Sequence, residues 1–210
     1  MKKKNLEGSI LTVVASLWWG IIGVVYFKFV SFANPVELVV HRTIWTAFVL
    51  LVTTFLLSKW KVFFKIIKNK KKLLLLFISG FLIMINWLTW LYAVSVDKLI
   101  DASFGYYIFP IFSVFFGVVF LKESYNKKKI FAIMLVFFSI IYLIITHKTL
   151  PWIGLTVATT FSIYGLIKKK IDIDSSIGLL IETLLLSPFA IIVFLYLVEL
   201  KLNIFSLNEI

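Results

Sequence analysis

The chain has 210 residues, of which 61% are hydrophobic and 15% charged, whereas soluble domains carry about 25% charged residues. This composition excludes a soluble globular protein, and we expect most of the chain to face lipid. The net charge is +12, but the basic residues lie in short clusters between apolar runs, as in the cytoplasmic loops of membrane proteins. We therefore expect no nucleic-acid partner.

Cysteine is absent from the sequence, so disulfides and thiolate metal sites are excluded. His41 and His147 have no ligand spacing, and the sequence contains no HExxH, Walker or GxGxxG motif. We expect neither a cofactor nor a metal. An intramembrane enzyme would need a nucleophile–base pair or metal ligands within its spans, and only His41 is eligible, so we expect no enzyme.

The apolar residues form seven windows, and a membrane-spanning helix needs about 20 such residues. The windows are residues 7–31, 35–57, 73–95, 100–121, 130–147, 151–168 and 177–198. The first is too long for the apolar core of a signal peptide, so we interpret it as an uncleaved helix. Residues 58–72, SKWKVFFKIIKNKKK, are too charged to cross and are expected to lie on the inner membrane surface. The sequence predicts an all-α membrane protein with about seven transmembrane helices.

The distribution of Lys and Arg predicts the orientation of these helices. With the N-terminus inside, the inner segments hold 17 of the 22 basic residues and the outer segments hold three. An excess of basic residues marks cytoplasmic loops. We expect a multi-pass protein of the bacterial inner membrane with a cytoplasmic N-terminus and the lipid bilayer around it.

A faint internal repeat relates the last two windows to the first two. WWGIIGVVYFK around Gly20 is echoed by SIYGLIKKK around Gly165, and HRT at 41–43 aligns with IET at 181–183. A repeat that starts again after five helices must insert upside down, and inverted repeats are typical of secondary transporters. Residues 1–148 would form one five-helix repeat, and residues 149–210 would form part of an inverted second one. Chance similarity in apolar sequence is the alternative.

Longer motifs run along nearly the whole chain. They are WWGI (18–21), YFK (26–28), ELVVHRTIW (37–45), NWLTWLYAV (86–94), DASFGYYIFP (101–110), LKES (121–124), FSIYGLIKKKI (161–171) and GLLIET (178–183). Because it contains this set of motifs in this order, the chain resembles the RarD-like permeases of the EamA group, in the drug/metabolite transporter superfamily. Phe109 departs from the pattern, which usually has Asn there. Family members have ten helices in two halves, so the resemblance implies a C-terminally truncated chain.

The start of the second window, PVELVVHRTIW at 35–45, carries three ionisable residues. At 100° per residue, Glu37, His41, Arg42 and Trp45 lie on one arc of the helix. Charged residues within spans cost about 2.5–3.5 kcal/mol and normally face a cavity or a partner. Arg42 either hydrogen-bonds helix carbonyls and locks packing, or supplies positive charge to an outward-open cavity and binds an anionic group of a substrate. The family resemblance favours the second interpretation.

The neighbours of Arg42 have alternative roles. Glu37 lies near the helix start, where a carboxylate complements the helix dipole, so capping competes with a role in the site. Lys28 ends the preceding window and is a candidate partner for Glu37. His41 is either structural or a proton relay, because an unperturbed imidazole titrates near pH 6.5.

Glu182 is the counterpart of Arg42 in the repeat and the only carboxylate well inside a window. It lies about 8 Å from the inner surface, whereas Arg42 lies about 10 Å below the outer surface. We therefore expect substrate or water between them rather than a direct salt bridge. Glu182 is also the candidate for proton coupling, because a buried carboxyl group can hold a proton near neutral pH.

Aromatic and amide residues complete the predicted substrate site. Asn86, Trp87 and Trp90 share one arc of the third window, and Tyr106 and Tyr107 precede Pro110 in the fourth. Trp and Tyr are also common as interfacial anchors, so a structural role is the alternative for each. The full set of predicted substrate-binding residues is Arg42, His41, Glu37, Trp45, Asn86, Trp87, Trp90, Tyr106, Tyr107 and Glu182.

These expectations together predict a secondary-active permease that moves a small polar or amphipathic organic solute by alternating access, with proton coupling as a further hypothesis. The expected partners are the lipid bilayer, a small-molecule substrate and a second copy of the chain. A small multidrug pump that dimerises around Glu182 is a rival within transport. The other alternative is a truncated non-transporting fragment, or a membrane subunit that requires another chain.

Overall fold

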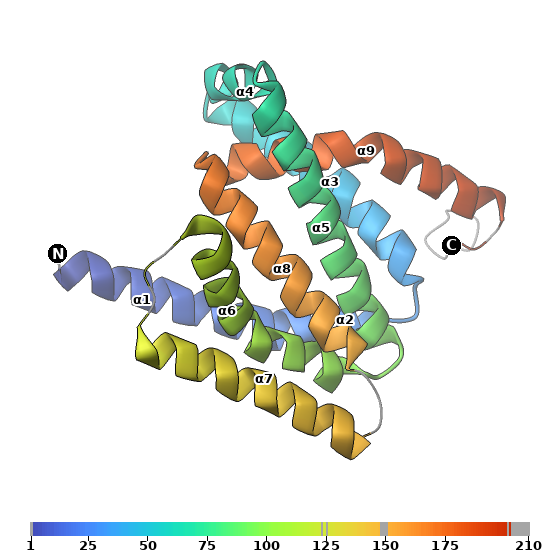
Figure 1. Cartoon of the computed structure of the whole chain (residues 1–210). Coiled ribbons are helices and arrows are strands. Elements are labelled where there is room, and N and C mark those ends of the chain that lie inside the picture. The colour runs from blue at the N-terminus through green and yellow to red at the C-terminus, as the bar shows by residue number, and fades with distance from the viewer. Residues whose placement is uncertain (1, 123, 125, 148–150, 201, 203–210) are drawn as a thin grey trace.

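The computed structural model describes residues 2–122, 124, 126–147, 151–200 and 202. Every element in this part of the chain is a helix, which confirms the all-α class predicted from composition (Figure 1). Helices occupy all seven apolar windows. The domain boundary predicted between residues 148 and 149 lies outside the described residues.

The first window forms one continuous helix at the periphery of the bundle. It comprises α1 (Lys2–Leu17), the π-helical segment η1 (Trp18–Gly23) and α2 (Val24–Phe29). Between residues 7 and 29, Gly23 is the only buried residue, and α2 packs against α5. Such an exposed apolar helix is suited to a lipid environment, where nonpolar side chains face acyl chains.

The next helices begin at side-chain caps. At the start of α3 (Pro35–Leu56), the Asn34 side chain accepts a hydrogen bond from the backbone N–H of Val36. At α5 (Lys70–Ser95), Asn69 caps the backbone N–H of Lys72 in the same way. Asn is favoured at both positions because its side-chain oxygen satisfies a backbone donor that has no partner within the helix.

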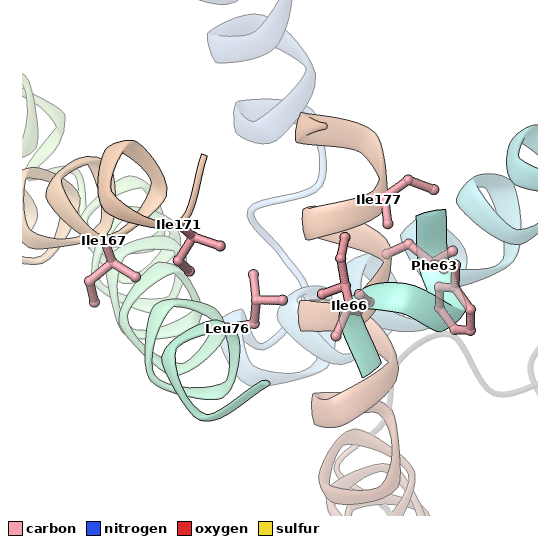
Figure 2. Packing of buried hydrophobic residues seen from close by; sticks show 8 residues of the cluster. Phe63, Ile66, Leu76, Ile167, Ile171 and Ile177 are labelled. Atoms are coloured by element: carbon pink, nitrogen blue, oxygen red, sulfur yellow. The ribbon is translucent and has the colours of Figure 1, made fainter. Parts of the chain in front are cut away.

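A cluster of buried hydrophobic residues joins four helices at one end of the bundle (Figure 2). The short helix α4 (Trp60–Ile67), in the segment predicted to lie on the inner membrane surface, contributes Phe63 and Ile66, whereas its Val62 and Phe64 stay exposed. The start of α5, the end of α8 (Trp152–Ile171) and the start of α9 (Ser175–Glu199) supply the other members. These are Leu76, Ile167, Ile171, Ile177, Leu180 and Ile181. The lysines around α4 and α8 make this the lysine-rich end.

The helix α8 lies between α5 and α6 (Leu99–Leu121), and it approaches α6 very closely (Figure 1). A Cβ atom on Gly105 would lie 2.6 Å from the carbonyl oxygen of Gly154, so a larger residue would force the helices apart. On the other side, the Asn86 amide donates to the carbonyl of Val157 and to the hydroxyl of Thr160, at 2.9 and 3.0 Å. Both contacts fix α8 in the centre of the molecule.

The remaining helices flank this centre. The helix α9 packs against α3 and α5, and α7 (Lys127–His147) lies along α6 (Figure 1). By length and composition, five helices in the described chain can cross a bilayer: 7–29, α3, α5, α6 and α9. The helix α7 offers a shorter apolar stretch, and α8, which ends in three lysines, is not among the five. The fold is that of a multi-pass membrane protein.

Candidate functional site

A pocket of about 750 Å³ opens between the first helix, α3 and α5. We call it the Arg42 pocket. Its lining residues are Trp19, Tyr26, Phe27, Leu38, His41, Arg42, Trp45, Thr46 and Trp87. Five of these nine residues are aromatic, and Arg42 supplies the only permanent charge. The volume falls within the range of about 300–1,000 Å³ that is typical of small-molecule sites.

The Arg42 guanidinium stacks on an indole ring. Its Cζ atom lies 3.2 Å from the centroid of the Trp87 ring, so a cation on α3 covers an aromatic face on α5. Among the described residues, the Arg42 side chain has neither a carboxylate partner nor a hydrogen-bond acceptor. A cation–π contact contributes about 0.5–2 kcal/mol and uses the face of the guanidinium. The N–H groups at its edge are left for an acceptor that enters the pocket.

Three rings pack against Trp87, and together the four form what we call the aromatic box: Trp19, Phe27, Trp87 and Trp90. Their centroids lie 5.1 Å apart for Trp19 and Trp87, and 6.1 Å apart for Trp87 and Trp90. Edge-to-face packing at such distances adds to the energy of burial. Trp19 comes from the π-helical segment η1, and a Cβ atom on Gly23 would lie 3.2 Å from its ring. Glycine at 23 therefore makes room for the Trp19 indole.

A second polar group, the Glu182 cluster, lies toward the lysine-rich end. It consists of Ser79, Tyr164, Lys168 and Glu182. The fully buried Glu182 carboxylate accepts hydrogen bonds from the Ser79 hydroxyl at 2.5 Å, the Lys168 ammonium at 2.9 Å and the Tyr164 hydroxyl at 3.5 Å. These partners come from α5 and α8, so one carboxylate on α9 joins three helices.

A narrow cavity of about 30 Å³ separates the two groups, and its lining includes both Arg42 and Glu182. Such a volume holds about one or two water molecules. The structure has no Arg42–Glu182 ion pair within the described chain, since Glu182 is bonded to Lys168 instead. That water or substrate lies between the two residues stays a prediction.

Comparison with known proteins adds an independent observation. Residues 6–145 match the EamA-like transporter family. The chain belongs to this family. The match confirms the resemblance seen in the sequence motifs.

Three curated relatives show how far the similarity extends. The chain is 34% identical over 188 residues to the uncharacterized transporter YojE of Bacillus subtilis, covering 88% of this chain and 63% of that protein. It is 33% identical to the protein RarD of Escherichia coli, covering 90% and 64%, and 31% identical to an uncharacterized transporter of Vibrio cholerae, covering 96% and 67%. The chain thus spans about two thirds of the length of these relatives. No solved structure matches it.

The relatives of this EamA-like chain are named as transporters or as RarD, which agrees with the expectation that it is not an enzyme. The four residues predicted to share one arc of α3 do not all face the same space. His41, Arg42 and Trp45 line the pocket, whereas Glu37 is fully buried and is not part of the lining. The His41 Nε2 atom lies 3.8 Å from a Glu37 carboxylate oxygen, and its ring packs against Phe194.

The predicted Lys28–Glu37 pair is wrong. Lys28 bonds the Asp97 carboxylate in the turn between α5 and α6. Lys28 is exposed at the end of α2, and Glu37 lies inside the bundle, so the exposed Asp97 is the accessible partner. The Asn34 side chain caps α3, and Glu37 lies in the first turn of this helix, where a carboxylate complements the helix dipole.

The other predicted residues of the EamA-like motifs have distinct positions. Asn86 faces α8 and binds its backbone. Trp90 is buried in the aromatic box, and Tyr106 packs against the hydrophobic cluster that contains Trp90 and against Phe161. Tyr107 is 81% exposed and lies outside the pocket lining. These four do not line the pocket, although Trp90 and Tyr106 support its wall.

Phe109, which departs from the family pattern, packs its ring 4.8 Å from that of Phe161 on α8. The Ser162 hydroxyl donates to the Phe109 backbone carbonyl at 3.1 Å. An apolar side chain thus takes part in the α6–α8 contact at this position, and the backbone carbonyl supplies the polar interaction.

Sequence analysis missed several residues of both sites. Trp19, Phe27 and Thr46 line the Arg42 pocket, and Ser79 and Lys168 bind Glu182. Trp19 and Phe27 belong to the WWGI and YFK motifs, so these motifs could have indicated that both residues belong to the site. Lys168 precedes the short turn between α8 and α9, which brings residues on these two helices together.

Outside the spans, Asp174 forms a surface ion pair in the turn that precedes α9. Its carboxylate lies 2.6 Å from the Lys59 ammonium and caps the backbone N–H groups of Ser176 and Ile177. The hydrogen bonds from Lys59 and Ser176 hold the pKa of the Asp174 carboxyl well below its ordinary range. This pair links α4 to the start of α9.

Proposed function

We propose that the chain is a secondary permease that moves a small polar or amphipathic organic solute by alternating access across the bacterial inner membrane, with its N-terminus in the cytoplasm. The observation that carries the proposal is the Arg42 guanidinium, which faces a 750 Å³ pocket without a counter-ion among the described residues. Membership of the EamA-like transporter family supports it.

The competing structural role for Arg42 requires partners inside the bundle. A guanidinium within a span is costly unless it binds a carbonyl, a carboxylate or water. Thr46 lies one turn away on α3 and lines the same pocket, but the described part of the chain provides Arg42 with no acceptor. An anionic group of a solute, with water in its absence, supplies the missing acceptor.

We assign the predicted residues three roles. Arg42 binds the anionic group of the solute, and Trp87 forms the wall beside it, with His41 and Trp45 in the same lining. Trp90 and Tyr106 position the aromatic box, and Asn86 fixes α8 against α5. Glu182 is the proton carrier, because protonation of its carboxylate would weaken the contact with Lys168 that joins α8 to α9.

The permease proposal is tested by flux in vesicles that contain the purified chain. A panel of anionic, neutral and cationic solutes is compared for wild type, Arg42→Ala and Lys28→Gln. Lys28 is the matched control because it is also a basic residue within a predicted span and it lies outside the pocket. We expect flux that Arg42→Ala abolishes and Lys28→Gln preserves. Equal flux in all three would contradict the role of Arg42.

Proton coupling has its own test. Glu182→Gln keeps the shape of the side chain but cannot exchange a proton, so we expect a flux that no longer changes with pH. The control is Glu37→Gln, which removes the other fully buried carboxylate and is expected to preserve the pH dependence. An unaltered pH dependence in Glu182→Gln would remove Glu182 as the carrier.

Orientation can be measured directly because the chain contains no cysteine. Single-cysteine variants at the exposed positions Lys61 and Lys98 would report opposite sides of the membrane. In intact cells we expect a membrane-impermeant thiol reagent to label Lys98→Cys and to leave Lys61→Cys unmodified. The reverse pattern would overturn the proposed orientation.

A second candidate function is that of a membrane subunit that transports only with another chain. The favouring observation is the exposed first helix, in which Gly23 is the only buried residue between positions 7 and 29. The flux experiment separates the two candidates. Flux from the purified chain alone supports the permease, whereas Arg42-dependent binding of a solute without any flux supports the subunit.

A further inference from the structure

We infer that the Arg42 pocket takes an aromatic monocarboxylate that carries no positively charged group. For transport of such a ligand, the inference rests on the proposed function. For binding, it stands on the pocket alone, so the two are tested separately.

The charge of the ligand follows from the lining. Arg42 is the only permanently charged residue among the nine. The guanidinium is planar and presents paired N–H donors at its edge, a geometry that matches the two oxygens of a carboxylate. Its face is already occupied by Trp87 at 3.2 Å, which fixes the plane in which the donors lie. A single carboxylate balances this single charge.

The aromatic character of the ligand follows from the walls. Trp19, Tyr26, Phe27, Trp45 and Trp87 all line the pocket, and they come from the first helix, α3 and α5. Aromatic pairs prefer edge-to-face or offset contacts with centroids about 4.5–7 Å apart, and each adds to the energy of burial. A ligand ring within this pocket meets aromatic surface on more than one side, whereas an aliphatic chain gains from burial alone.

The exclusion of a cationic group follows from the carboxylates nearby. An α-ammonium group beside the bound carboxylate would need an anionic partner, because an unpaired buried charge is costly. The lining contains neither Asp nor Glu. Glu37 is fully buried outside it, and Glu182 is reached only through the 30 Å³ cavity and already binds Lys168. The pocket therefore selects against amino acids by leaving their ammonium group unpaired.

The experiment uses three probes that share one skeleton: 3-phenylpropionate, its neutral amide, and phenylalanine, which adds one ammonium group to the acid. Binding to the 210-residue chain in lipid nanodiscs is measured by calorimetry. A hydrogen bond to a charged group changes affinity by about tenfold or more. We expect the acid to bind at least about tenfold more tightly than the amide and than phenylalanine.

Variants identify the part of the pocket that is responsible. Arg42→Gln removes the charge, so the acid should lose its advantage over the amide, while Lys28→Gln should keep it. Trp87→Leu should weaken both the acid and the amide, because it removes an aromatic wall. Trp152→Leu is the matched control, since this tryptophan is 47% exposed on α8 and packs against Tyr92 outside the pocket. Circular dichroism of each variant verifies that its helices are intact.

Three binding outcomes overturn the inference. Phenylalanine bound as tightly as the acid would mean that an ammonium group finds a partner, and an amide bound as tightly would mean that Arg42 does not bind an anion. Absence of binding for all three probes at millimolar concentration would mean that the pocket is not a site for this class. Arg42-dependent flux of a different solute would then leave the permease proposal standing. Binding of the acid without flux would instead contradict the permease and leave this inference intact.

Discussion

Two ionisable residues in apolar surroundings, Glu182 and Arg42, have opposite environments. Glu182 is fully buried and accepts hydrogen bonds from three side chains on two other helices. Arg42 is half-buried, stacks on Trp87 and has no acceptor among the described side chains and backbone groups. Charge inside a membrane protein needs compensation. For Glu182 the protein itself supplies all of it, whereas for Arg42 it supplies an aromatic face and an open pocket.

The comparison distinguishes a charge that the protein itself compensates from a charge that is left for a ligand to compensate. Removal of Glu182 leaves the Lys168 ammonium without its partner, so the free energy of unfolding should fall. Removal of Arg42 leaves a pocket with the same aromatic walls, so the affinity for a ligand should fall while the free energy of unfolding changes little.

The largest effect on stability is expected for Glu182→Leu. Breaking a buried ion pair by removing one partner costs about 3–5 kcal/mol. We expect about 3 kcal/mol here, at the lower end of that range, because the Lys168 side chain retains 19% exposure. Thermal unfolding in detergent measures the loss. The double variant Glu182→Leu with Lys168→Met should recover most of it, and failure to recover would mean that Ser79 and Tyr164 carry the stabilisation instead.

Arg42→Gln should show the reverse profile. The free energy of unfolding should change by less than about 1 kcal/mol, since only the cation–π contact with Trp87 is lost. Affinity for an anionic solute should fall by about 1.5–3 kcal/mol, which corresponds to about 10–100-fold. Unfolding and binding are measured on the same preparation. A stability loss as large as that of Glu182→Leu would break the contrast and make Arg42 a structural residue.

The sequence predicted the helices well and the environments of these two residues less well. Hydrophobic windows of about 20 residues locate spans because every backbone polar group in lipid must be satisfied within a helix. The arc around Arg42 followed from the 100° rotation per residue, and it correctly placed His41, Arg42 and Trp45 together. Helical periodicity does not reveal which neighbouring helix each side chain meets, so the burial of Glu37 could not be predicted.

The partners of Glu182 illustrate the same limit. Ser79 lies 103 positions away on α5, and Lys168 was expected only as a basic residue at the inner end of the sixth window. Their meeting depends on how α5, α8 and α9 cross, which is set by close contacts such as that between Gly80 and Glu182, where an added Cβ atom would lie 3.3 Å from the Glu182 Cβ. Contacts of this kind depend on three-dimensional packing rather than on any local pattern.

Trp87→Leu tests how much the aromatic wall of the Arg42 pocket contributes to ligand affinity. The substitution removes the ring under the guanidinium and one wall of the aromatic box, and we expect affinity for an anionic solute to fall by about 1 kcal/mol. Trp87→Phe keeps an aromatic face and should lose less than Trp87→Leu. Calorimetry with the wild-type ligand measures both. If Trp87→Phe and Trp87→Leu are equivalent, the indole serves only as apolar packing.

The smallest effect is expected for an ion pair in water, between Lys59 and Asp174, whose side chains are 32% and 38% exposed. The folded-state pKa of Asp174 is depressed, so its contribution to stability is present at neutral pH and is lost as the pH falls below the unfolded value of about 3.9. Solvent screening limits this contribution to about 0.5 kcal/mol. Asp174→Asn keeps a side chain that can cap α9 but removes the charge, so unfolding curves recorded between neutral and acidic pH should show a slightly flatter pH dependence for the variant than for wild type. If Asp174→Asn lowered the free energy of unfolding as much as Glu182→Leu does, an exposed Lys–carboxylate pair would contribute as much as a buried one. Burial would then not explain the importance of the Glu182–Lys168 pair.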